Sequence, residues 1–187
     1  MRIIAGIAKR TVLAAPKGLD TRPTSDMAKE SLFNILSGEI HGARFLDLFC
    51  GSGAIGLEAI SRGAKEAVFV ENAAHAISAL LQNLEKTKLA DYAEVLRMPV
   101  AKALDSLSAS GRQFDIIFLD PPYDTTLLQE TIDKLADTNI LAKHGVIIAE
   151  TDSKLHAMPL RLEVTDTRIY GRSCFMFINM ENRKVCQ

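Results

Sequence analysis

Apolar residues follow two alternating patterns along this chain. Short, largely apolar runs, typical of buried parallel strands, occupy residues 43–49, 67–70, 114–119 and 146–150, and a further strand is expected near 93–97. Stretches with an apolar residue every three or four positions, typical of amphipathic helices, lie between them at about 54–62, 74–87, 100–107 and 127–137. Strands that alternate with helices predict βαβ units and a mostly parallel sheet covered on both faces.

The two ends of the chain depart from this alternation. Residues 2–14 read as one or two short strands around Gly6, and a helix is expected from Ser25 to about Ile40. Residues 160–169 and 173–180 read as two strands joined by a turn, an antiparallel pair at the sheet edge. The pattern therefore predicts a doubly wound, seven-stranded α/β sheet, mostly parallel, with an antiparallel C-terminal strand pair and a short N-terminal β-hairpin.

Composition excludes several classes of protein. Of the 187 residues, 48% are apolar and 24% are charged, which is ordinary for a folded globular chain. There is no apolar run of about 18 residues for a membrane span and no signal-peptide core. The three cysteines lie far apart and the four histidines are scattered, so we expect neither a disulfide framework nor a metal site. These features predict a cytoplasmic protein, and we expect a monomer.

Charge is distributed unevenly along the chain. Residues 1–22 carry a net charge of +4, residues 23–153 carry −8, and residues 154–187 carry +3. An acidic body with basic ends is compatible with a polyanionic partner held at one edge. A solvated surface with chance asymmetry explains the same distribution, and charge alone does not choose between the two.

The first chemical motif lies between a strand and a helix. The segment from Gly51 to Gly56 matches the pattern GxGxxG directly after the run at 43–49. Glycines there let the backbone turn tightly and approach a ligand closely. Glu71 ends the next strand, where a carboxylate can accept hydrogen bonds from both hydroxyls of a ribose. Together these features predict a nucleotide-cofactor site at the carboxyl ends of the strands.

Asp47 bears on the choice between NAD and S-adenosylmethionine. It stands inside an otherwise apolar strand, four residues before Gly51, and a buried carboxylate is costly unless it is paired or hydrogen-bonded. An acid there would repel the pyrophosphate of NAD but attract the sulfonium and ammonium of S-adenosylmethionine. Asp47 can also bond the backbone of the glycine loop, and one carboxylate can do both.

The second chemical motif is the run Asp120-Pro121-Pro122-Tyr123, which follows the strand at 114–119. Both prolines fix φ and lack an N–H, so the loop is stiff. A carboxylate, a free carbonyl and an aromatic face suit a planar base with an exocyclic amine. Asp120 and the Pro121 carbonyl would accept from the amine, Tyr123 would stack on the ring, and this orientation would aim the amine at a methyl group.

With these motifs the chain resembles the bacterial 16S rRNA (guanine-N2)-methyltransferases, a family of class I S-adenosylmethionine-dependent methyltransferases. The resemblance is carried by residues 2–6, 21–26, 30–34, 47–59, 120–123 and 170–171, together with Glu71. It implies a Rossmann-like fold and methyl transfer from S-adenosylmethionine to a guanine amine. The implied partner is small-subunit ribosomal RNA or an assembling 30S particle.

The resemblance also assigns residues. It implies that the cofactor is bound by Asp47, Gly51, Ser52 and Gly53 at its methionine part, by Glu71 at its ribose with Asn72 beside it, and by a cover made of Arg22, Pro23 and Thr24. It implies that the flipped guanine is received by Asp120, Pro121, Pro122 and Tyr123, and that RNA is met by Lys9, Arg10 and Lys17. Residues 1–21 would then form a basic extension, and residues 22–187 the methyltransferase domain.

One position departs from the family pattern. After the third strand the family usually has an Asp or Asn that bonds the adenine amine, and here the corresponding position is Pro99. The side-chain contact is therefore absent, and the backbone N–H of Val100 is left as the group that can meet the adenine ring.

Three alternatives stay open at this stage. A DNA adenine-N6 methyltransferase would use the same Asp-Pro-Pro-Tyr chemistry, although the chain has no inserted target-recognition segment between its motifs. An NAD-dependent oxidoreductase would share the glycine loop, but Asp47 and the proline loop argue against it. A non-catalytic RNA-binding module would keep the basic ends but would have no need for Glu71 and Asp120 together.

Overall fold

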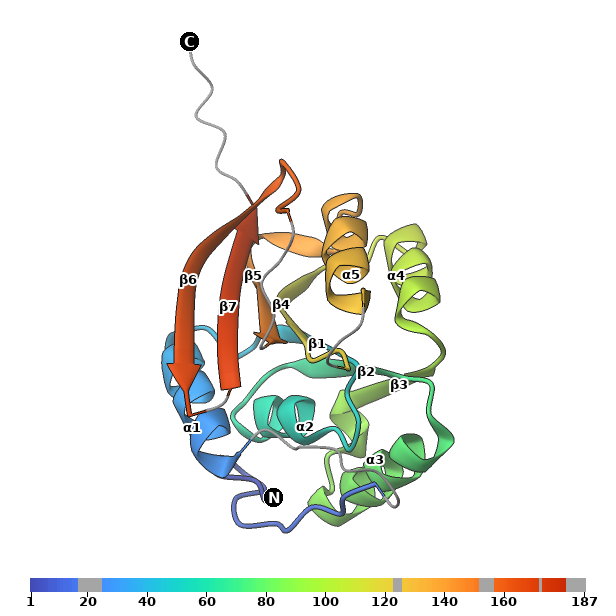
Figure 1. The fold of residues 1–187 in the computed structure, drawn as a ribbon. Helices are drawn as coiled ribbons and strands as arrows, with labels where there is room; N and C mark the ends of the chain where they lie inside the picture. The colour runs from blue at the N-terminus through green and yellow to red at the C-terminus, as the bar shows by residue number, and fades with distance from the viewer. Residues whose placement is uncertain (17–24, 123–125, 152–156, 172, 181–187) are drawn as a thin grey trace.

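A computed structural model describes residues 1–16, 25–122, 126–151, 157–171 and 173–180. Its centre is a seven-stranded sheet in the order β3-β2-β1-β4-β5-β7-β6, with helices on both faces (Figure 1). The doubly wound sheet predicted from the apolar pattern is thus confirmed. No helix in these ranges is long and apolar enough to cross a membrane.

The strands follow the predicted runs closely. Their bounds are β1 Arg44–Leu48, β2 Glu66–Glu71, β3 Ala93–Arg97, β4 Phe114–Leu119, β5 Leu141–Thr151, β6 Leu162–Tyr170 and β7 Ser173–Met180. Strands β1 to β5 are parallel where they pair, and β7 runs antiparallel to both β5 and β6. Strand β5 begins five residues earlier than predicted, because Leu141 pairs with Phe114 before a shift in register.

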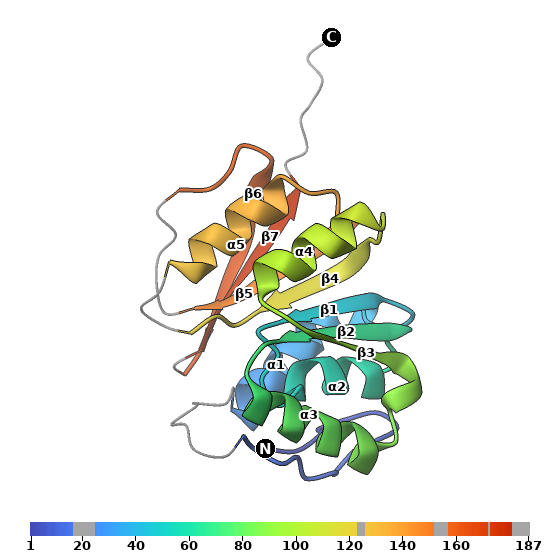
Figure 2. The same cartoon turned by 90° about the vertical axis from the view of Figure 1, so that its right-hand side faces the viewer.

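The helices divide into two layers. Their bounds are α1 Asp26–Ile35, α2 Ala54–Ser61, α3 Ala74–Thr87, α4 Val100–Ala109 and α5 Leu127–Ala136, with 3-10 turns at Leu36–Gly38 and Ala90–Tyr92. Helices α1, α2 and α3 cover one face of the sheet and α4 and α5 the other (Figure 2). Buried apolar side chains fill the space on both sides, such as Phe45 and Phe69 on the first and Leu46 and Ile117 on the second.

Helix α1 shows both a confirmed and a corrected expectation. Ser25 is the N-cap, since its side-chain oxygen accepts a hydrogen bond from the Ala28 amide at 3.1 Å. The helix ends at Ile35 rather than at about Ile40, and the chain continues as a 3-10 turn to Gly38. Ser37 and Gly38 are poor helix formers, which explains the early end.

The N-terminal segment folds back on itself but forms no regular strand within residues 1–16. A single antiparallel bridge pairs Arg2 with Val12, where the sequence predicted a short hairpin. Gly6 and Arg10 both have a positive φ, 81° and 75°, which interrupts the extended backbone that a strand needs. Helix α2 holds the segment in place, because Glu58 accepts hydrogen bonds from the amides of Ile4 and Ala5.

Candidate active site

The loops that follow the parallel strands meet at one edge of the sheet and enclose a cavity of about 710 Å³. Because β1, β2, β3 and β4 run in the same direction, their carboxyl ends lie side by side there. Seven of the residues predicted from the sequence line this cavity: Gly51, Ser52, Glu71, Asn72, Asp120, Pro121 and Pro122. Both chemical motifs, about seventy residues apart in the chain, thus face the same space.

The glycine loop uses its two glycines for different purposes. Gly51 has φ +54°, and a Cβ built on it would meet no atom within 4 Å, so this backbone faces open space. Gly53 has φ +77°, and a Cβ there would lie 2.3 Å from Cδ1 of Leu80. Gly53 does not line the cavity; its role is to let α2 start close against α3. A ligand therefore has close backbone access at Gly51 and Ser52.

Glu71 ties three backbone amides together at the end of β2. One carboxylate oxygen, Oε2, accepts from the Gly51 amide at 3.0 Å. The other, Oε1, accepts from the amides of Asn72 and Ala73 at 2.8 and 2.9 Å. A carboxylate has about four lone-pair sites, so Glu71, which lines the cavity, retains capacity for one hydroxyl donor. Glu71 thus shapes the glycine loop, a duty that the sequence did not indicate.

Asp47 lies beneath the glycine loop rather than in the cavity. Asp47 is only 2% exposed, and its Oδ2 accepts a hydrogen bond from the Gly56 amide at 2.9 Å. Burial raises the pKa of Asp47 to about 7, and the negative charge of Glu71 adds to the shift while the Gly56 bond opposes it. Of the two roles considered for Asp47, the bond to the loop backbone is observed, and attraction of a cationic ligand stays a prediction.

Asp120, Pro121 and Pro122 line the cavity at the end of β4. Burial raises the pKa of Asp120 well above its ordinary value, and the negative charges of Glu150 and Asp47 raise it further. Leu119 pairs with Ala149 in the parallel register, which places Glu150 beside Asp120 on the next strand. Glu150 is 3% exposed and was not predicted, although an acid that directly ends the apolar run at 146–149 was a usable signal.

Of two further walls of the cavity, the sequence indicated only Pro99 and the backbone of Val100. One wall is formed by Met98, Pro99, Val100, Ala101 and Leu104, at the end of β3 and on α4, and another by Leu127, Glu130, Thr131 and Lys134 on α5. Pro99 is the N-cap of α4, so the usual acidic position is used here to start a helix. The first wall could have been identified from the apolar residues that begin α4 directly after β3.

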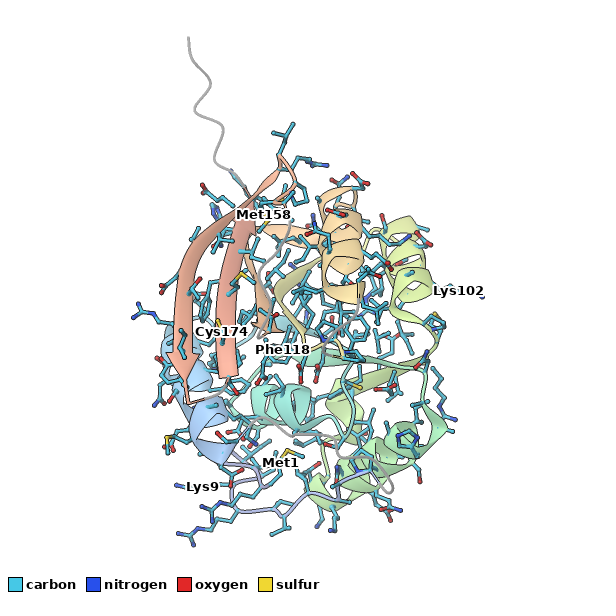
Figure 3. All side chains as sticks on the ribbon, viewed as in Figure 1. Met1, Lys9, Lys102, Phe118, Met158 and Cys174 are labelled. Carbon is cyan, nitrogen blue, oxygen red and sulfur yellow. The ribbon has the colours of Figure 1, made fainter. Side chains whose placement is uncertain are left out.

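Of the other predicted site residues, the four that the structure describes, Asp47, Gly53, Lys9 and Arg10, do not line the cavity. Lys9 and Arg10 are exposed on the N-terminal segment, and Lys9 lies at the outer edge of the molecule (Figure 3). Lys17, Arg22, Pro23, Thr24 and Tyr123 lie outside the described residues. In the part of the chain that is described, there is no cluster of three or more His, Cys, Asp or Glu side chains that could hold a metal ion.

The sheet order, the antiparallel β7 and the glycine loop after β1 define a Rossmann-like methyltransferase domain. A family model described as conserved hypothetical protein 95 matches residues 1–179, and the chain belongs to this family. It is 33% identical to ribosomal RNA small subunit methyltransferase D of Escherichia coli over 183 residues, which cover 97% of this chain and 90% of that protein.

Two further comparisons agree with this assignment. The chain is 38% identical to ribosomal RNA small subunit methyltransferase D of Haemophilus influenzae over 155 residues, 81% of this chain and 79% of that protein. A solved structure of a hypothetical protein from Thermus thermophilus superposes with a TM-score of 0.83 at 30% identity, covering 96% and 99% of the two chains. The methyltransferase family that the sequence resembled is therefore confirmed.

Proposed function

We propose that this protein transfers a methyl group from S-adenosylmethionine to the exocyclic N2 amine of a guanine in small-subunit ribosomal RNA. The observation that carries the proposal is one cavity lined both by the glycine loop with Glu71 and by the Asp120-Pro121-Pro122 loop. The first set suits a nucleoside cofactor, and the second suits an amine acceptor. The names of the relatives, ribosomal RNA small subunit methyltransferases, support RNA as the substrate class.

The residues around the cavity fit S-adenosylmethionine. Open space over Gly51 can accommodate the methionine part, Glu71 can accept from a ribose hydroxyl, and Met98 and Val100 offer an apolar wall to the adenine ring. Asp47, directly beneath the loop, is proposed to favour a cation when its carboxyl group is ionised. When bound, this cofactor supplies an electrophilic methyl group on a sulfonium. Arg22, Pro23 and Thr24 are proposed to cover it.

The Asp120 loop is proposed to prepare the amine. The lone pair of a guanine N2 amine is shared with the ring, so the nitrogen is a poor nucleophile. Asp120 and the Pro121 carbonyl would accept hydrogen bonds from the two N–H groups of this amine, which would turn its lone pair toward the methyl group. A buried carboxylate with a raised pKa is also a stronger base, so Asp120 could take the amine proton as the N–C bond forms and the bond between the methyl carbon and sulfur breaks, its electron pair passing to sulfur. Tyr123 is proposed to stack on the base.

The substrate RNA is proposed to contact the basic N-terminal segment. Lys9 and Arg10 are exposed there, and Lys17 follows in the sequence. Such side chains bind phosphates without reading sequence, so their task is to position the RNA. The target base would then be turned out of its stack into the cavity.

The test is methyl transfer from radiolabelled S-adenosylmethionine to small-subunit particles that lack the modification, followed by nucleoside analysis. N2-methylguanosine is the expected product. N6-methyladenosine would favour the adenine-specific alternative, and lack of incorporation into particles or free RNA would contradict the proposal. Titration of the pure protein with NAD serves as the control for the oxidoreductase alternative, and no binding is expected.

A further inference from the structure

Asn83 on α3 connects two segments of the chain that lie far apart in sequence. The residue is 0% exposed. Its Oδ1 accepts from the Ala14 amide at 2.7 Å, and its Nδ2 donates to the carbonyls of Ala14 and Ser52, both at 3.0 Å. The two donors and the acceptor of this amide are thus all used. One buried side chain holds the end of the N-terminal segment and the glycine loop at a fixed separation.

The partners of Asn83 belong to segments that border the cavity. Ser52 lines it directly, and Ala14 does not line it but is followed by Ala15 and Pro16, which do. Lys86, one turn further along α3, donates from Nζ to the Val12 carbonyl at 3.3 Å. Side chains of α3 therefore hold both the N-terminal segment and the glycine loop by hydrogen bonds. Asn83 itself does not line the cavity.

We propose that Asn83 is a positioning residue for the cofactor, which sets the distance between the glycine loop and the wall formed by Ala15 and Pro16. The proposal rests on the proposed function only for the identity of the cofactor. Without the amide, the Ser52 carbonyl and both backbone groups of Ala14 lose buried partners, which is unfavourable unless the two segments move. Such movement changes the shape of the cavity at the place where the methionine part is expected.

The experiment compares binding of S-adenosylhomocysteine to the wild type and to Asn83→Ala by calorimetry. Asn83→Ala is expected to weaken binding by about tenfold, the effect of losing roughly one well-placed hydrogen bond. In steady-state assays the KM for S-adenosylmethionine should rise while kcat changes little, because the Asp120 loop is not touched by Asn83.

Leu84→Ala is the matched control for stability. Leu84 is the next residue on α3, is 5% exposed and packs in the core, so its truncation destabilises the fold without breaking the link. Folded Leu84→Ala protein should bind S-adenosylhomocysteine like the wild type. Gln82→Ala, an exposed change on the same helix, controls for the helix surface.

If Asn83→Ala does not fold, Asn83→Asp replaces it. This side chain has the same shape and keeps an oxygen for the Ala14 amide, but it loses the donors to the Ala14 and Ser52 carbonyls, so weaker binding is again expected. Equal weakening in Leu84→Ala, or wild-type affinity in the Asn83 variants, would overturn the proposal. Failure of the wild type to bind S-adenosylhomocysteine at all would instead count against the proposed function.

Discussion

At the scale of single residues, the site is dominated by acids on one face of the sheet. Asp47 pairs with Phe118 in the β1–β4 register, so Asp120, two residues further along, points to the same face, and Glu150 lies beside it on β5. Figure 3 shows Phe118 near the centre of the sheet. Negative charges this close oppose one another's ionisation, so the charges of Glu150 and Asp47 raise the pKa of Asp120 further than burial alone does.

Replacing Asp120 tests its role as a base. Because its pKa is raised, its carboxylate form grows as pH increases above the ordinary carboxylate range, so wild-type kcat should rise with pH over that interval. Asp120→Ala should lower turnover by at least about 10²-fold, and Asp120→Asn should do likewise with the pH dependence removed. Calorimetry should show little change in cofactor affinity. Near-full activity of Asp120→Asn would mean that Asp120 only orients the amine.

The raised pKa of Asp47 predicts how the free energy of unfolding of the ligand-free protein depends on pH. Its folded pKa is about 7 against an ordinary value of 3.8, so the folded protein holds a proton that the unfolded chain has released between these limits. The stability that this proton provides is fully present below about pH 4 and is lost as pH rises to about 7, by up to roughly 4 kcal/mol. Asp47→Asn cannot titrate and can still accept from Gly56. Urea unfolding should therefore show that, between pH 5 and pH 8, the free energy of unfolding falls more for the wild type than for Asp47→Asn. An equal fall in both proteins would contradict the raised pKa of Asp47.

At the scale of elements, the approach of α2 to β2 fixes the glycine loop. Every residue of α2 is buried, and its third residue, Gly56, leaves no room for a side chain. A Cβ there would lie 2.4 and 2.8 Å from Cε1 and Cζ of the Phe69 ring, and 3.1 Å from Oδ2 of Asp47. The glycine is thus required by packing, in addition to the amide that it donates to Asp47.

Gly56→Ala should consequently destabilise the protein. The Phe69 ring is rigid and fully buried, so the helix must shift, and overpacking of this kind costs about 1–3 kcal/mol. Cofactor binding should weaken as well, because the loop moves with the helix. Gly38→Ala is the control, since a Cβ there meets nothing within 4 Å. Denaturant unfolding of both variants checks the prediction, and equal stabilities would contradict it.

The sequence predicted elements better than the contacts between them. Continuous apolar runs located the parallel strands because strands covered on both faces have this pattern, and the loops after them followed from topology. The roles of Asn83 and Lys29 depend on partners far along the chain. Lys29 is fully buried, with Nζ 2.6 Å from the Arg2 carbonyl and 3.1 Å from Glu58, and its helical spacing alone marks it as an ordinary α1 residue. Periodicity reports the face of an element and carries no information about such long-range pairs.

At the scale of the whole molecule, the structure shows where the acidic and basic parts of the chain lie. The acids that end β2, β4 and β5 gather at the carboxyl edge of the sheet, while the basic N-terminal segment lies across α2, held by Glu58. In Figure 3, Lys9 lies at one edge of the molecule and Lys102, on α4, at the opposite edge. Under the proposed function, an RNA guided to the N-terminal side would be kept off these acids except where a base enters the cavity.

The salt dependence of RNA binding tests this arrangement. Lys9→Ala, Arg10→Ala and Lys17→Ala combined should weaken binding of a ribosomal RNA fragment, since each phosphate that is no longer neutralised keeps its counterion. The slope of log K against log salt concentration should fall by about 0.7–0.9 for each such phosphate.

The control removes the same charge elsewhere in the sequence, through Lys65→Ala, Lys102→Ala and Lys143→Ala, at exposed residues that are not part of the N-terminal segment. Because it leaves the proposed interactions intact, the control should keep a slope close to that of the wild type, and cofactor affinity should be unchanged in both. Equal weakening in the two triple variants would show that only net charge matters, and a wild-type slope in the first would remove the N-terminal segment from the RNA interface.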